Sequence, residues 1–260
     1  MKAYTRLLVE VFRANLAAVF AYRIPSLVQV FGMVLNNASF LVFWAALLRH
    51  TGTVGGWGLR DVLYLWALGP SAFGLAHILF GNARQLGTLI VQGDLDVYLL
   101  QPKDPQFHAL ISRTVPAAWG DFFYGFVLLP FITHDPLRMG LFAIFTVTGA
   151  LVFVGFFSLV QSLAFWLGNI SGLASAVTEL MLSFTLYPEP VFPQPMRWVF
   201  YSLIPAGFLA FLPIHVLRTL DWVWLPVTMA AALALLVLSA AVFRLGLRRY
   251  ESGNAQGGRI

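Results

Sequence analysis

The sequence contains no cysteine, and only 10% of its 260 residues are charged. The absence of cysteine excludes disulfide frameworks and thiolate metal sites. Soluble globular domains carry about 25% charged residues, so a chain with few charges and 59% hydrophobic residues cannot hide its apolar surface in a soluble fold. Together with a mean hydropathy of +0.80, this composition indicates an integral membrane protein.

The sequence also lacks the motifs of nucleotide, zinc and serine-hydrolase chemistry. No Walker A pattern (G-x-x-x-x-G-K-[ST]) is present, because the only lysines, Lys2 and Lys103, follow no glycine-rich turn. No H-E-x-x-H, H-x-E or G-x-S-x-G string occurs either. We therefore expect a non-enzyme with no catalytic residue, no metal site and no cofactor of its own, and a chain too short to include a fused ATPase.

Apolar segments of about 20 residues, the length that crosses a bilayer as a helix, define the expected architecture. We predict one all-α polytopic transmembrane domain over residues 1–260, with six transmembrane helices. The predicted spans are residues 24–48, 62–80, 109–132, 140–167, 172–187 and 223–243.

Two further segments are rich in apolar residues but do not have the pattern of a single transmembrane helix. In residues 1–22 the charged residues follow one stripe of a helix and apolar residues the opposite side, which predicts an amphipathic helix in the membrane interface. Residues 188–220 are mostly apolar but contain six prolines, too many for one uninterrupted helix. We predict that they form a re-entrant helical pair in the outer half of the bilayer, before the last span.

The distribution of lysine and arginine predicts the orientation. Eleven of the sixteen lie on the side of both termini and of residues 81–108, and five lie on the other side. Because cytoplasmic loops carry an excess of these residues, we place both termini, the 81–108 loop and the tail 244–260 in the cytoplasm of a multi-pass protein of the cell (inner or plasma) membrane. The net charge of +5 is thus explained by the membrane topology and does not indicate nucleic-acid binding.

Three ionisable residues fall within or near the predicted spans, namely His77, Asp121 and Glu179. An unpaired ionisable side chain costs roughly 2.5–3.5 kcal/mol at the bilayer centre. These residues can form a polar pathway or proton relay, or they can serve interhelical hydrogen bonding and helix-end snorkelling. One acid per helix is weak evidence for a relay, so the second interpretation is favoured.

The predicted cytoplasmic loop combines acidic, aromatic and leucine residues in its stretch 92–105. Such a loop between two spans is a plausible docking surface for a soluble partner. The alternative is a solvated connector.

Three stretches carry a resemblance to a known family. The first is the amphipathic N-terminus that leads into the Arg23–Ile24–Pro25 corner, and the second is the pattern G-x-L-D-x-Y-L-L-x-P beginning at Gly93. The third is the proline- and aromatic-rich stretch 187–213. Together they resemble the membrane subunits of ABC-2 type exporters, in the branch of small six-helix permeases whose ATPase is a separate chain.

The resemblance implies a type V exporter that moves an amphiphilic or hydrophobic substrate (a drug, a lipid or a peptide-like compound) out of the cytoplasm. Its partners would be a second permease chain, identical or paralogous, two ABC ATPase subunits that bind ATP and Mg, and membrane lipids, with no nucleic acid. The implied ATPase-coupling residues are Arg6, Arg13, Gly93, Asp94, Leu95, Asp96 and Tyr98. The implied outer-gate residues are Tyr187, Pro188, Phe192, Pro193, Pro205 and Phe208.

Two alternatives from other classes depend on the ionisable residues in the spans. An intramembrane enzyme would use His77, Asp121 and Glu179 as an acid–base cluster, which requires hydrogen-bond reach between them. An ATP-independent channel or carrier would use the same residues as its pathway and would transport without an ATPase.

Overall fold

The computed structural model describes residues 2–250, so residues 251–260 of the predicted tail lie outside the described part. Every named element within this range is a helix, which confirms the all-α prediction there. Four helical stretches are long and apolar enough to cross a membrane. They are α2 (Arg23–Thr51), α3 (Leu59–Leu79), the pair α8 (Pro136–Ser162) and α9 (Ala164–Leu167), and α13 (Trp224–Leu247).

Two shorter apolar helices occupy the other predicted spans, α7 (Ala118–Ile132) and α10 (Ser171–Leu186). At about 1.5 Å per residue, their 15 and 16 residues extend about 22–24 Å, which is less than the roughly 30 Å of a hydrocarbon core. The four long stretches therefore fit the bilayer unaided, and a count of six complete spans stays a prediction.

The third predicted span, residues 109–132, is not one helix. A short helix, α6 (Pro105–Ile111), covers its first three residues and ends there, and α7 begins only at Ala118. Pro116 lies in the gap and disfavours helical backbone in the residue before it. Two hydrogen bonds to the end of α3 replace the missing helical ones, from Thr114 Oγ1 to the Ile78 oxygen at 2.8 Å and from Val115 N to the His77 oxygen at 3.2 Å.

The bundle is built around α3, which packs against α7 and α8, while α13 packs on the far side of α8. α3 and α8 are mainly buried, whereas α2 and α13 leave most of their surfaces exposed at the two edges. Two glycines allow α3 and α7 to approach closely. A Cβ at Gly74 of α3 would lie 2.5 Å from the Phe122 nitrogen, and one at Gly125 of α7 would collide with the Ala67 oxygen. Small residues allow this backbone-to-backbone packing in membrane helices.

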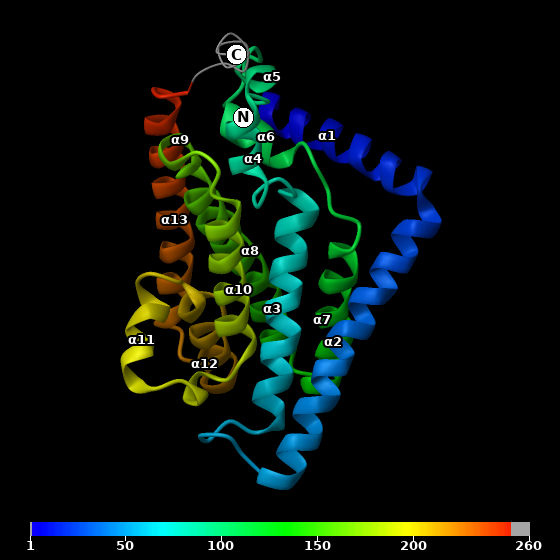
Figure 1. Cartoon of the computed structure of the whole chain (residues 1–260). Coiled ribbons are helices and arrows are strands. Elements are labelled where there is room, and N and C mark those ends of the chain that lie inside the picture. Colours follow the sequence, from blue (N-terminus) through cyan, green and yellow to red (C-terminus); the bar gives the residue numbers. More distant parts are fainter. Residues whose placement is uncertain (1, 251–260) are drawn as a thin grey trace.

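The short helices gather at opposite ends of the bundle (Figure 1). One end, here named the α4–α6 end, holds the start of α1 (Lys2–Ala21), the C-terminal end of α13, and α4 (Leu86–Gln92), α5 (Asp96–Leu99) and α6. α1 runs outward from this end before the chain turns into α2. The other end holds the segment 188–220, which consists of η1 (Glu189–Val191), α11 (Gln194–Tyr201), a π-helix η2 (Gly207–Phe211) and α12 (Leu212–Thr219).

Candidate functional site

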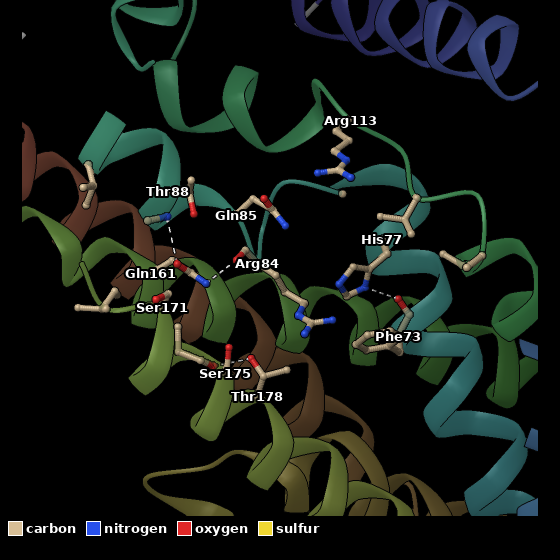
Figure 2. A pocket seen from close by; sticks show the side chains of 18 of the residues that line it. Phe73, His77, Arg84, Gln85, Thr88, Arg113, Gln161, Ser171, Ser175 and Thr178 are labelled. Carbon is tan, nitrogen blue, oxygen red and sulfur yellow. Dashed lines mark hydrogen bonds between the residues drawn. The ribbon is translucent and has the colours of Figure 1, made fainter. Parts of the chain in front are cut away.

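A cavity of about 650 Å³ lies at the α4–α6 end of the bundle. Its walls come from α3, α4, α7, α8 and α10, from the connections 81–85, 112–117 and 168–170, and from Met33 of α2. Figure 2 shows polar side chains from these elements converging on one space. Ligand sites commonly have volumes of about 300–1,000 Å³, so this cavity has the size of a small-molecule site.

Two arginines, Arg84 and Arg113, project into this cavity from the two connections (Figure 2). Among residues 2–250, neither guanidinium takes part in a hydrogen bond or an ion pair, although the Arg84 guanidinium carbon lies 6.0 Å from the centre of the Phe73 ring. Both arginines are exposed, but the partial burial of the Arg84 side chain lowers its pKa from the ordinary value, and the negative charge of Glu179 opposes that effect. Both side chains still carry a positive charge, because arginine is not deprotonated in proteins.

The backbone around these arginines is held in place by specific hydrogen bonds. Gly81 N donates to the Arg113 oxygen at 3.0 Å, which joins the two connections to each other. The amide of Gln161 in α8 donates to the Arg84 oxygen at 2.5 Å and accepts from Gly87 N at 3.1 Å. The two charges are thus mounted on an anchored frame and not on free loops.

His77 of α3 lines the same cavity and is only 4% exposed. Its Nδ1 lies 2.9 Å from the Phe73 oxygen, and its Nε2 has no hydrogen-bond partner among the described residues. Because a carbonyl oxygen only accepts, Nδ1 carries the hydrogen, and Nε2 of the neutral ring offers an unpaired lone pair. Buried polar atoms are normally paired, so this nitrogen is a candidate contact for a ligand.

Asp121 of α7 also lines the cavity and is 4% exposed, but its carboxylate is already engaged. Asn37 of α2 donates to Asp121 Oδ1 at 2.7 Å, and Tyr124 OH donates to the Asn37 oxygen at 3.4 Å. Glu179 lies exposed on α10 and is not part of the lining. Within residues 2–250, no hydrogen bond or ion pair joins any two of His77, Asp121 and Glu179. The geometry therefore gives Asp121 an interhelical role and offers an acid–base cluster no support.

The residues nominated for ATPase coupling differ in their accessibility. Gly93 ends α4 in the left-handed conformation with φ 82°, which glycine adopts without strain. Leu95 is fully buried, and Tyr98 OH lies 2.9 Å from Ser112 Oγ. These three residues shape the loop, whereas Asp94 is exposed and Asp96 is half-buried.

The same loop exposes apolar side chains that sequence reasoning did not nominate. Val97 is 64% exposed and Leu100 is 85% exposed, and Leu99 beside them is also exposed. The signal in the sequence was a run of leucines in an otherwise polar connection. We name Asp94, Val97, Leu99 and Leu100 the α5 surface.

The α4–α6 end is tied to the edges of the molecule. Asn15 of α1 donates to the Ile111 oxygen at 3.3 Å, and Arg6 and Arg13 are exposed on the same helix. On the other side, Gln106 of α6 donates to Ser239 Oγ of α13 at 2.9 Å. A displacement of α6 would therefore pull on α1 and on α13.

The residues nominated for the outer gate lie in or beside an aromatic cluster at the end opposite the cavity. The Phe192 ring packs against Phe184 and Phe200, with ring centroids 5.3 and 5.0 Å apart. Pro188 and Pro205 are buried, whereas Pro193 is exposed at the start of α11. The ring centroids of Tyr187 and Trp44 lie 5.8 Å apart, and those of Phe208 and Tyr201 lie 5.5 Å apart.

No group of three histidine, aspartate or glutamate side chains suited to a metal ion occurs in the described part of the chain. The polar lining of the cavity combines arginine, amide, hydroxyl and imidazole groups with the single carboxylate of Asp121. Such groups bind ligands by hydrogen bonds and charge.

The family model described as ABC-2 family transporter protein matches residues 34–254. The chain belongs to this family. It is an ABC-2 type permease, the membrane component of an ABC transporter, and permeases of this family generally work with an ATPase partner. The match confirms the resemblance seen in the sequence. No curated protein and no solved structure matches the chain.

Proposed function

We propose that this permease moves an amphiphilic or hydrophobic compound out of the cytoplasm across the cell membrane, driven by ATP hydrolysis on two separate ATPase subunits that bind ATP and Mg. The observation that carries the proposal is the exposed α5 surface, which is mounted on helices bonded to α1, α8 and α13. Leu100 is 85% exposed beside exposed Val97 and Leu99, and such an apolar group is suited to burial against a soluble partner.

The proposed coupling runs from the α5 surface into the bundle by two routes. One passes through α6 to α1, where Asn15 donates to the Ile111 oxygen. The other passes through α4 to α8, where Gln161 accepts from Gly87 N. Closure of the ATPase subunits would press on α5 and displace α4–α6, and both routes would carry that movement to the helices around the cavity.

A second permease, identical or paralogous, is part of the proposal. One chain provides a cavity at the α4–α6 end, while the opposite end is filled by the aromatic cluster around Phe192 and Phe200. A continuous route outward would therefore form between two chains, and the nominated outer-gate residues would close it. Under this model both termini face the cytoplasm and segment 188–220 dips into the outer leaflet before the sixth span.

Co-purification of the permease with its ATPase tests the proposal. Asp94→Lys is the informative variant, because Asp94 is exposed and its side chain makes no hydrogen bond among residues 2–250. We expect it to reduce ATPase recovery while leaving membrane insertion and yield unchanged. Asp221→Lys is the control for charge, because it makes the same charge change on the connection between α12 and α13 at the other end. Its yield is compared as well, since Asp221 accepts a hydrogen bond from Val223 N at 3.2 Å.

The proposal fails if the wild-type permease forms no stable complex with the ATPase and does not alter its hydrolysis rate. It fails equally if reconstituted vesicles that contain the permease alone transport substrate, because that result identifies an ATP-independent carrier.

A further inference from the structure

We infer that the cavity at the α4–α6 end binds the oxyanion headgroup of an amphiphile, a phosphate or a carboxylate, between the guanidinium groups of Arg84 and Arg113. The inference rests on the proposed export function and specifies its substrate class. Arginine is the side chain best suited to both oxyanions, because its planar fork donates two parallel hydrogen bonds.

The charge inventory of the cavity favours an anion. The lining contains two arginines and one carboxylate, that of Asp121, which accepts a hydrogen bond from Asn37 at 2.7 Å. Glu179 faces Arg84 from α10 at long range but is exposed and forms no ion pair with it among the described residues. Within residues 2–250 neither guanidinium has a hydrogen bond or an ion pair, and both arginines are exposed where they line the cavity. Both charges are thus accessible to an anion that enters from solvent, and charge-assisted hydrogen bonds are stronger than neutral ones.

The backbone that carries the two arginines is held before any ligand arrives. The bond between Gly81 N and the Arg113 oxygen and the bond from Gln161 to the Arg84 oxygen hold both backbones. A ligand therefore pays little ordering entropy for the frame, and only the ends of two side chains need to adjust.

His77 and the hydroxyl side chains of α10 indicate which other groups the headgroup carries beside its oxyanion. His77 Nε2 is buried without a partner among the described residues and can accept a hydrogen bond from a hydroxyl. Figure 2 shows the imidazole on the same side of the cavity as Arg113, with Ser171, Ser175 and Thr178 of α10 across from it. A headgroup that carries hydroxyls next to its anion fits this wall better than a bare ion.

Binding measurements on the full-length permease alone, in a neutral maltoside detergent, test the inference. The main probe is lysophosphatidylglycerol, which has one acyl chain, one phosphodiester charge and free hydroxyls. Lysophosphatidylcholine of the same chain length keeps the phosphodiester anion but adds a quaternary ammonium, so that its net charge is zero. The matching fatty acid provides a carboxylate. An alkyltrimethylammonium salt provides the opposite charge. Titration calorimetry gives the dissociation constant of each.

We expect lysophosphatidylglycerol, the fatty acid or both to bind at least about tenfold more tightly than lysophosphatidylcholine and the cationic probe, and the tighter of the two identifies the preferred oxyanion. Arg84→Gln and Arg113→Gln should each weaken anion binding about tenfold or more, since each removes a charge-assisted contact. Arg113→Lys should retain part of the affinity. Arg248→Gln is the matched control, because Arg248 is exposed at the same end and does not line the cavity.

Equal binding of all four probes by the wild-type protein, or tightest binding of the cationic one, overturns the inference without reference to any variant. It is also overturned if both arginine variants, eluting as the wild-type protein does, keep the wild-type affinity. Because no ATPase is present, these outcomes are independent of the co-purification experiment. A permease that binds anions but recruits no ATPase would refute the export function and leave the binding site in place.

Discussion

Replacement of Asn37 by leucine removes the one hydrogen bond that the Asp121 carboxylate accepts within residues 2–250, the 2.7 Å contact from the Asn37 amide. Both residues are 4% exposed, so the carboxylate loses its one protein donor among the described residues and can be solvated only from the cavity that it lines. The substitution also tests the role assigned to Asp121, because a residue that joins α2 to α7 must be energetically coupled to its partner, whereas a residue of a transport pathway need not be.

The expected coupling energy between Asn37 and Asp121 follows from the length and burial of their hydrogen bond. A hydrogen bond to a charged group contributes about 1.5–3 kcal/mol in soluble proteins, whereas measured side-chain hydrogen bonds between membrane helices average about 0.6 kcal/mol with a maximum near 1.7. The short distance and the burial of both partners place this bond towards the upper limit of the membrane series. We expect a coupling energy of about 1–1.5 kcal/mol, and a smaller effect from Tyr124→Phe, which removes only the 3.4 Å bond to the Asn37 oxygen.

A double-mutant cycle measures this coupling. The free energy of unfolding is determined by titration with sodium dodecyl sulfate in mixed micelles for the wild-type protein, Asn37→Leu, Asp121→Leu and the double variant. Asn37→Leu alone should be the most destabilised, because it leaves a buried carboxylate unpaired. If the two single effects add within about 0.3 kcal/mol, the limit for independent sites, the interhelical role of Asp121 is refuted.

Three further predictions concern packing, pH and the partner surface. Gly125→Leu should reduce the free energy of unfolding by about 1–3 kcal/mol, because its side chain would separate α7 from α3, while Gly140→Leu, which has open space around it, should change it little. Burial lowers the pKa of His108 from its ordinary value of 6.5, so the folded state binds this proton less readily than the unfolded state. Lowering the pH below the ordinary value should therefore reduce the Tm, and His108→Gln should diminish that dependence. Leu100→Asp should weaken ATPase recovery without lowering the Tm, because that side chain is 85% exposed, and unchanged recovery would contradict the α5 surface.

The sequence was most informative where composition and helix length decide the outcome. A long apolar run bounded by polar residues predicts a helix well, and α3 (Leu59–Leu79) and α13 (Trp224–Leu247) lie close to the predicted spans 62–80 and 223–243. The break between α6 and α7 was not foreseen, because Val115, Ala117 and Ala118 read as part of an apolar helix. Tertiary hydrogen bonds determine this break, because the end of α3 supplies the acceptors for Thr114 and Val115.

The cavity could not be predicted in the same way. Its charged residues, Arg84 and Arg113, are 29 positions apart, and in the sequence they contribute only to the count of positive charges on one side. Their convergence depends on the hydrogen bond from Gly81 to the Arg113 oxygen, a contact that no local pattern specifies. His77 and Asp121 were singled out as polar residues in spans, and only the structure separates them, since one has an unpaired nitrogen and the other a bonded carboxylate.

The proposed binding site and the proposed partner surface share one piece of chain. Arg84 stands two residues before α4, and α4 leads through Gly93 to the α5 surface. Because Gln161 holds both the Arg84 oxygen and Gly87 N, α4 cannot move without changing the position of Arg84 or breaking those bonds. Arg113 would follow through its bond to Gly81. A force applied at α5 would therefore reach both guanidinium groups directly, so that release of an anionic headgroup and closure of the ATPase would be mechanically linked.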